Sequence, residues 1–522
     1  MKKYLCFLLL FCLGCQTTSS KSEQTLRLSI NQDPISFDPR QGGDDITSMV
    51  LGLLFDGLVK EENGEIKNNL ASHIEISENG LIYIFKLKNT FWSNGEKVTA
   101  YDFEQSWKRI IDPRFETHYS YMLYTIKNAR AANANEKPLN DVGIWALDEH
   151  TLKVELEHPA PYFLHQLLRP SFAPVYYKLD QTFPNWTHPK EKRYVSNGAF
   201  LLDFYEDNDE VILKKNPYYH EVEKVHLNKI HFAIIDSPTT VFDLFMSKEL
   251  DWFGYPTSDI SQELIDSAKK SYPIHPLNIC SVNIVEFNTR VFPFSNAHIR
   301  KALTLALNRK KITQSRSINE KIATSFLPPQ TQLQKKPYFK DCDSKQALWH
   351  LEQGLKELNL KKSDLDHITL GFGSSENNNR TAQILQQQWQ KTLGIHIDLH
   401  PFEWKVFFDL LGTENVPFGM YTWSSELNDP ICNLNLFQYE DNYLNSSGWS
   451  DPGYAALLEM SDSCKHIKKR KQMLHLAEKI LMDAMPICPL YYKKEIYFKK
   501  DNLHGIEISK MGDVNFKYAY FK

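Results

Sequence analysis

The sequence has little glycine, little net charge and no long apolar run, and each shortage excludes a class of protein. Glycine accounts for 21 of 522 residues, which excludes a glycine-rich fibre. Lys and Arg number 60 against 64 Asp and Glu, a net charge of −4, so no basic surplus indicates nucleic-acid binding. The main apolar run, residues 4–13, reaches only about 15 Å as a helix, half of a bilayer's hydrocarbon core. A membrane channel is therefore excluded as well.

The sequence also lacks the strings that mark two common kinds of hydrolase. It contains neither a GxSxG nucleophile elbow nor an HExxH zinc helix. The Gly/Ser stretch GFGSSE, residues 371–376, fits no phosphate-binding loop. An exported hydrolase remains an alternative, but without a motif to support it. We expect no enzymatic activity, no catalytic residue and no cofactor.

Cysteine is sparse and irregularly spaced. Of eight cysteines, five follow Cys15, and none of their spacings matches a CxxC or CxxH zinc pattern. These five are Cys280, Cys342, Cys432, Cys464 and Cys488. Two disulfides at most can form. Buried free thiols that pack as small apolar groups are the favoured interpretation.

One short segment carries metal-ligand side chains at regular spacing. His396, Asp398 and His400 alternate with apolar residues and share one face of an expected strand. Such alternation is what a half-exposed strand requires, so the polar set is expected to face water. A metal site on this face is the less favoured alternative, and we expect no metal.

What is present is typical of a large, soluble, multidomain protein. Apolar residues make up 42 % of the chain and charged residues 24 %, with aromatic residues at 13 %. At about 150 residues per domain, the length predicts about three domains. Aromatic rings fill large cores, and they also line pockets for ligands that are partly apolar.

The first residues indicate export. Lys2 and Lys3 precede the apolar run, and Gly14 and Cys15 end it before a polar stretch. This ending resembles a bacterial lipoprotein cleavage box, in which Cys15 becomes the lipidated first residue. The leucine usual three places before that cysteine is replaced by Cys12. A plain signal peptide, cut after Gly14 or later, is the alternative.

Strand and helix patterns interleave along the chain. Alternating apolar residues predict strands at 25–31, at 81–88 after an Asn79-Gly80 turn, and at 394–400. Helical spacing predicts helices from Thr99 to a stop before Asp112-Pro113, at 297–312 and at 380–394. This interleaving favours an α/β fold with a largely buried sheet.

Several stretches, in one order, resemble the family 5 bacterial extracellular solute-binding proteins, which include oligopeptide-binding lipoproteins of ABC transporters. The matching stretches are spread along essentially the whole chain after the leader. They are LFDGLVKEENGEIKNNLA (54–71), FWSNGEKVTAYDFEQSWKRIIDP (91–113), SNGAF (196–200), LKKNPYY (213–219), VEFNTRVFPFSNAHIRKALTLALNRKKI (285–312), EWKVFFDLL (403–411), WSSELNDP (423–430) and GWSDPGYAALL (448–458).

The resemblance implies a periplasmic-binding-protein-like α/β fold of type II (cluster C), with two lobes, a hinge and an extra domain. Domain I and domain II would form one lobe and domain III the other, closing as rigid bodies around a ligand. The implied segments are a signal peptide at 1–14, domain I at 15–46, 172–277 and 493–522, domain II at 47–171, and domain III at 278–492.

The resemblance also implies a ligand site. An unpaired ammonium in a closed cleft costs several kcal/mol, and in peptide-binding relatives a carboxylate shortly after a Trp pairs with it. Glu426 holds that position here, one methylene longer than the usual Asp. Trp423, Trp404 and Asp33 are further candidates, and Ser425 and Asn428 complete the set. A solvated Glu426 and core-packed tryptophans are the alternatives.

Some ligand-binding positions depart from the peptide-binding pattern. Arginines common in relatives are replaced by Leu411 and Met420. Tyrosines that relatives carry before the Phe-Asn-Thr stretch (287–289) are replaced by Val282, Ile284 and Val285. Fewer fixed partners then remain for a ligand's carboxylate. The family follows from the sequence, but the exact ligand does not.

The implied function is that of a lipid-anchored, extracytoplasmic substrate-binding subunit of an ABC importer. We expect a monomer that captures short peptides and delivers them to a permease and its ATPase, with no nucleic-acid partner. Two alternatives remain open on the same scaffold. One is a non-peptide ligand such as a nickel chelate, haem or sugar, and the other is a surface interaction protein.

Overall fold

The computed structural model describes residues 24–117, 119–316, 318–413, 415–442 and 444–522. The predicted signal peptide, residues 1–14, and the predicted lipidation site Cys15 lie outside these residues. Across the described ranges, no helix combines the length and apolar character that a membrane crossing requires.

Two four-stranded sheets form the first half of the chain. The first contains, in order, β1 (Thr25–Ile30), β10 (Lys229–Ile234), β9 (Glu210–Lys215) and β8 (Phe200–Glu206), with β1 parallel to β10. The second contains β4 (Ala71–Ile76), β5 (Ile82–Leu87), β7 (Thr151–Glu155) and β6 (Ile144–Asp148). The predicted strands at 25–31 and 81–88 are therefore confirmed, the latter as an arm of the β4–β5 hairpin.

The first half of the chain also contains helices. They include α1 (Asp45–Leu54), α2 (Ala100–Ile111), α3 (Ala129–Asn133), α4 (Phe163–Gln166) and α5 (Tyr177–Thr182). Of these, α1 contacts β8, and α2 contacts β6 and β7. The predicted start of α2 is confirmed: Thr99 and Asp102 form a capping box, in which the Thr99 N–H donates to the Asp102 carboxylate at 2.7 Å. The buried Trp107 indole on α2 donates to the Phe172 carbonyl at 2.9 Å, which fixes the helix against the following chain.

The larger sheet belongs to the second half and has seven strands. Its main order is β11 (Trp252–Gly254), β17 (Ile487–Lys499), β12 (His275–Phe287), β16 (Phe418–Ser424), β14 (Ile368–Gly373) and β15 (Ile397–Phe402), and β13 (Lys321–Ile322) pairs with β17. Strands β14, β15 and β16 run parallel, so their carboxyl ends share one edge. The other pairs of this sheet are antiparallel, so the sheet is mixed. Helices that alternate with its strands along the chain confirm the α/β class.

The remaining helices cover this sheet or connect its strands. They are α6 (Pro238–Met246), α7 (Gln262–Ala268), α8 (Ala297–Leu305), α9 (Arg309–Gln314), α10 (Ser344–Leu358), α11 (Glu376–Leu393), α12 (Trp404–Leu410), α13 (Pro430–Leu434), α14 (Pro452–Asp462) and α15 (Ile467–Ala484). Three two-stranded ribbons complete the fold: β2 (Val59–Glu62) with β3 (Glu65–Asn68), β18 (Leu503–His504) with β21 (Tyr520–Phe521), and β19 (Glu507–Ile508) with β20 (Val514–Asn515).

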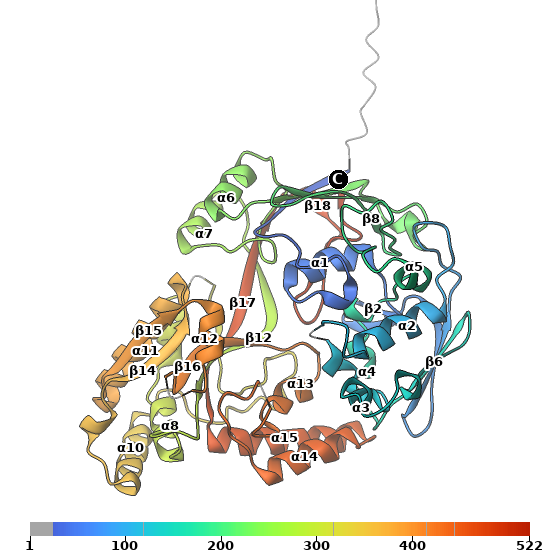
Figure 1. Cartoon of the computed structure of the whole chain (residues 1–522). Helices are drawn as coiled ribbons and strands as arrows, with labels where there is room; N and C mark the ends of the chain where they lie inside the picture. Colours follow the sequence, from blue (N-terminus) through green and yellow to red (C-terminus); the bar gives the residue numbers. More distant parts are fainter. Residues whose placement is uncertain (1–23, 118, 317, 414, 443) are drawn as a thin grey trace, which may run out of the picture.

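The long antiparallel strands β12 and β17 link the two halves. Figure 1 shows them running between the upper part, near α6 and α7, and the part that holds β14–β16 and α8. Their pairing is interrupted between Asn278 and Val282 by a register shift. The predicted domain boundaries at residues 278 and 492 fall inside these two strands.

The predicted helix at 297–312 is wrong as one element. It is two helices, α8 and α9, separated at Asn308. Asn308 has an extended backbone, with φ −98° and ψ 93°, and its side chain accepts from the Lys311 N–H at 3.0 Å. A side chain that caps a new helix outweighs the continuous apolar periodicity.

Two other element boundaries differ from the prediction. Helix α11 begins at Glu376 rather than 380 because Ser375 caps it, accepting from the Asn378 N–H at 3.2 Å. It ends before Gly394, at φ +70°, as predicted. Strand β15 begins at Ile397 rather than 394 because the preceding residue's N–H donates to the Asp366 carboxylate.

The five cysteines that follow the leader are free thiols in the structure. Cys280 and Cys488 are buried, as expected for small apolar groups. Cys342 is exposed, so the expectation of burial is wrong for this residue.

Candidate ligand-binding site

Glu426 is the second residue after the end of β16, on a segment that is fixed by several hydrogen bonds and an ion pair. The Ser425 N–H donates to the Cys280 carbonyl at 2.8 Å, and the Ser425 hydroxyl bonds to the Asn433 side chain. Asp429 caps α13 and forms an ion pair with Arg470 at 2.7 Å. The backbone on both sides of Glu426 is thus fixed to the larger sheet and to α13 and α15.

Two residues from the first half of the chain contact Glu426. The Tyr121 hydroxyl donates to its carboxylate at 2.7 Å. The Arg169 guanidinium donates twice to its backbone carbonyl, at 2.8 and 3.2 Å. Segments more than 250 residues apart in sequence therefore meet at this carboxylate.

The half-buried Glu426 carboxylate can still accept a hydrogen bond from a cationic group of a ligand. Within the described ranges, no lysine or arginine forms an ion pair with this carboxylate, and the nearby Arg169 guanidinium donates to the Glu426 backbone carbonyl. A carboxylate so placed gains most from a charge-assisted hydrogen bond with an ammonium group.

The electrostatics at neighbouring Tyr119 reflect this negative charge. Burial raises the pKa of Tyr119. The charge of Arg169 opposes that shift, while the carboxylates of Glu426 and Asp44 add to it. The tyrosine hydroxyl therefore stays protonated and can donate or accept a hydrogen bond at neutral pH.

The other predicted residues of this half are differently placed. Trp423, on β16, is partly buried against the core, and its indole N–H has no hydrogen-bond partner within the described chain. Trp404, at the start of α12, is 51 % exposed and lies over Gly373, where an added Cβ would approach its ring to 2.6 Å. Asn428 is half-buried, and Ser425 serves the local hydrogen bonds described above.

Asp33 lies apart from this group. Its carboxylate accepts from the Tyr205 hydroxyl at 2.9 Å and faces the Asn208 N–H at 3.3 Å. These partners belong to the β8–β9 hairpin and its turn. The structure thus gives Asp33 a local role in joining the end of β1 to this hairpin.

The chain matches the sequence model of "Bacterial extracellular solute-binding proteins, family 5 Middle" over residues 65–445, well over half of its length. The chain belongs to this family. The oligopeptide-binding protein OppA of Bacillus subtilis is 36 % identical over 510 residues, covering 96 % of this chain and 94 % of that protein.

Solved structures of oligopeptide-binding proteins confirm the fold. The periplasmic oligopeptide-binding protein OppAIV of Borrelia burgdorferi has a TM-score of 0.81 at 27 % identity, covering 96 % of this chain and all of that one. OppA of Listeria monocytogenes bound to peptide has a TM-score of 0.77 at 27 % identity, covering 96 % and 99 %. The fold is thus the mixed α/β architecture of cluster C binding proteins, and such a protein acts by binding a solute rather than by catalysis.

Sequence reasoning missed two residues of this solute-binding protein's candidate site, Tyr121 and Arg169. Each lies in a short connecting segment without a chemical motif: Tyr121 in a 3₁₀ turn, Arg169 just before another. Only the fold brings them to Glu426. Tyrosines clustered at 119–124 were the single available signal.

The protein also has a cavity of about 1040 Å³ elsewhere, between residues 34–41, α2 and residues 180–191. The buried Arg40 beside it forms ion pairs with both Asp38 and Asp180 at 2.7 Å. Because two carboxylates already neutralise Arg40, this cavity has no free charge from Arg40 with which to bind a charged ligand. The group around Glu426 is therefore the better candidate site.

Proposed function

We propose that the chain is the extracytoplasmic substrate-binding subunit of an ABC importer, and that it captures short peptides and delivers them to a membrane permease. The observation that carries the proposal is the half-buried Glu426 carboxylate, which faces Tyr121 and has no cationic partner among the described residues. The oligopeptide-binding names of its relatives support the same ligand class.

The chemistry of a general peptide site accounts for this arrangement. Peptides of varied sequence share only their amides, their α-amino group and their carboxylate, so a site must grip these. We propose that the ligand's ammonium binds Glu426, with the Tyr121 hydroxyl as a neighbouring partner. Trp423 and Trp404 provide flat apolar walls that accept varied side chains. Asn428 adds a polar group on the same segment.

We propose that binding closes two lobes. Domain I (15–46, 172–277 and 493–522) and domain II (47–171) form one lobe, domain III (278–492) the other, and β12 and β17 carry the hinge. Contacts between the proposed lobes support closure: besides those at Glu426, Lys465 donates to the Glu78 carbonyl at 3.2 Å. The Arg470 guanidinium also lies over the Tyr162 ring, 5.7 Å from its centre.

Delivery requires the protein to stay near its permease. We propose that export, cleavage before Cys15 and lipidation of that residue tether the chain to the membrane surface. A single acyl chain anchors weakly and reversibly, so stable anchoring takes more than one. The tethered monomer then encounters the permease and its ATPase subunit repeatedly at high local concentration.

A thermal-shift panel tests the ligand class. We expect mixed tri- to pentapeptides to raise the melting temperature by a few degrees, because a ligand at 100 times its Kd adds about 2.7 kcal/mol of stability. Nickel chelates, haem and sugars are expected to leave it unchanged. Stabilisation by one of these, with none by peptides, would overturn the peptide proposal, and no response to any would favour a surface interaction role.

A further inference from the structure

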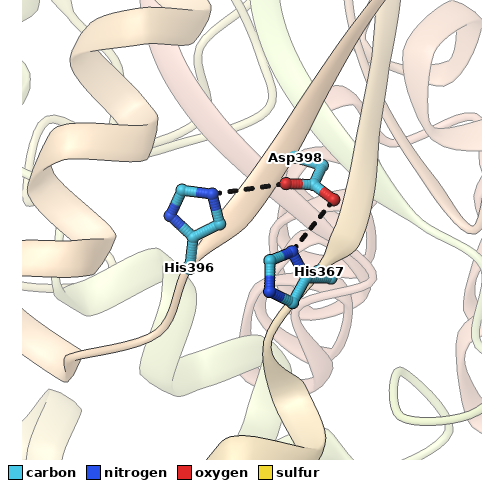
Figure 2. A group of neighbouring side chains, drawn as sticks. All are labelled: His367, His396 and Asp398. Carbon is cyan, nitrogen blue, oxygen red and sulfur yellow. Dashed lines mark hydrogen bonds and ion pairs between the residues drawn. The ribbon is translucent and has the colours of Figure 1, made fainter.

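A cluster of metal-ligand side chains lies far along the larger sheet from Glu426. It consists of His367, His396 and Asp398, and Figure 2 shows both imidazole rings turned toward the one carboxylate. The His396 Nε2 lies 3.3 Å from Asp398 Oδ1, and the His367 Nδ1 lies 3.3 Å from Asp398 Oδ2. One ligand atom from each residue falls within 4.8 Å of the other two.

The backbone holds these three residues in place. Strands β14 and β15 pair in parallel, and the residues just before them form further hydrogen bonds. The His367 N–H donates to the His396 carbonyl at 2.8 Å, and the His396 N–H donates to the Asp366 carboxylate at 2.7 Å. His367 adopts a left-handed backbone with φ +65°, which an ordinary connection into a strand does not require. The cluster therefore rests on a fixed scaffold rather than on a loose loop.

Sequence reasoning named a different third residue. It correctly predicted that His396 and Asp398 face water, since His396 is exposed and Asp398 half-buried. It grouped them with His400, which the structure places further along β15, with its ring against Phe402 at 4.2 Å. His367 takes that place, because the chain enters β14 beside the start of β15. The pairing of β14 with β15 brings His367 beside His396, and the spacing of residues along the sequence does not reveal this pairing.

We propose that His367, His396 and Asp398 bind a divalent transition-metal ion of the zinc class. Zinc prefers four ligands in a tetrahedron at about 2.0–2.1 Å, which places neighbouring ligand atoms about 3.3 Å apart. The two imidazole–carboxylate separations are both 3.3 Å, but they run to different oxygens of Asp398. A side-chain rotation therefore has to bring one carboxylate oxygen and both imidazole nitrogens, which already lie within 4.8 Å of one another, around a single ion. Nitrogen and oxygen donors in a two-histidine, one-carboxylate set suit zinc, nickel and copper ions better than magnesium or calcium. The exposure of the cluster leaves the fourth position to water.

This site is separate from the proposed peptide site. The cluster lies at the amino ends of β14 and β15, whereas Trp404 lies over Gly373 at the carboxyl end of β14. Glu426 follows the carboxyl end of β16, which runs parallel to β14. Six residues of strand separate the two ends, about 20 Å. The metal proposal therefore stands or falls independently of peptide binding.

Zinc titration of the untagged chain, by calorimetry at mildly alkaline pH, tests the proposal. Free imidazole is neutral under these conditions and can act as a ligand. We expect one zinc ion per chain. His367→Ala and His396→Ala should each weaken binding at least about tenfold, since loss of even an outer-shell partner costs about 10- to 100-fold. The matched control is His400→Ala, an exposed histidine on the same strand, which should bind zinc as the wild type does.

Cobalt substitution supplies a second readout. A site of this kind is expected to give the intense visible absorption of four-coordinate Co²⁺, and either histidine substitution should abolish it. The proposal is overturned if the wild type binds no zinc. It is equally overturned if either histidine variant keeps wild-type affinity, or if His400→Ala loses as much as they do.

Discussion

Glu426→Gln is expected to lower the affinity for peptides with a free α-amino group by about 30-fold to several thousand-fold. This range corresponds to the 2–5 kcal/mol typical of truncating one partner of a buried, hydrogen-bonded charge pair. The amide keeps the size of the side chain and its contact with Tyr121 but removes the charge that we assign to the ligand's ammonium. Isothermal titration calorimetry with one tight-binding peptide measures the change.

Acetylating the same peptide separates charge from shape. Wild-type protein should bind the N-acetylated form weakly, and Glu426→Gln should bind both forms with similar weak affinity. Glu440→Gln, which removes an exposed carboxylate from the same half of the chain, is the matched control and should behave as wild type. Equal binding in all four combinations of protein and peptide would discard Glu426 as the amine partner.

Lys517→Met is expected to destabilise the whole fold by about 3–5 kcal/mol, because it leaves a buried carboxylate without its main cation. Asp56 is 3 % exposed, and its carboxylate contacts the Lys517 ammonium, the Tyr219 hydroxyl at 2.9 Å and the His220 ring at 3.2 Å. This contact joins the chain after α1 to the C-terminal segment. The fall in melting temperature measures the effect.

The same pair predicts a pH dependence. Burial alone would raise the pKa of Asp56, but Lys517 and His220 outweigh it and hold that pKa well below its usual range. A lowered pKa stabilises the fold above the unfolded value of about 3.9 and loses that contribution as pH falls through the folded value. We therefore expect the difference in unfolding free energy between wild type and Lys517→Met to become smaller as the pH falls below about 4.

Two further variants keep this interpretation specific. Lys214→Met breaks an exposed ion pair with Asp203, and such pairs contribute about 0–1 kcal/mol. It should therefore melt close to wild type. Adding Asp56→Asn to Lys517→Met removes the unpaired negative charge, so the double variant should regain part of the stability that Lys517→Met loses. A Lys517→Met protein as stable as the Lys214→Met control would contradict the assigned role of this pair.

The correct sequence predictions of helix ends rested on residues close together in the chain. Thr99 and Asp102 mark the start of α2 because capping depends on residues three apart, and Gly394 ends α11 because glycine tolerates the left-handed backbone. The break at Asn308 was missed because the apolar periodicity continues through this residue, although asparagine favours helix caps over helix interiors.

Long-range pairing limited the prediction of the site. Glu426 stood out because it follows a tryptophan in a stretch that resembles family 5 proteins. Tyr121 and Arg169 could not be placed beside it, since the contacts span 305 and 257 residues of chain. For the same reason the sequence prediction grouped His400, rather than His367, with His396 and Asp398. The sequence shows which side chains could bind a ligand. Which of them contact one another depends on how distant segments pack together in the fold.

A crystal structure of the chain with a bound tri- to pentapeptide tests the central claim most directly. The account predicts an extended peptide enclosed between the two proposed lobes, with its α-amino nitrogen within hydrogen-bond distance of the Glu426 carboxylate. A peptide bound elsewhere, or halves packed together with no room for a ligand at Glu426, would contradict it.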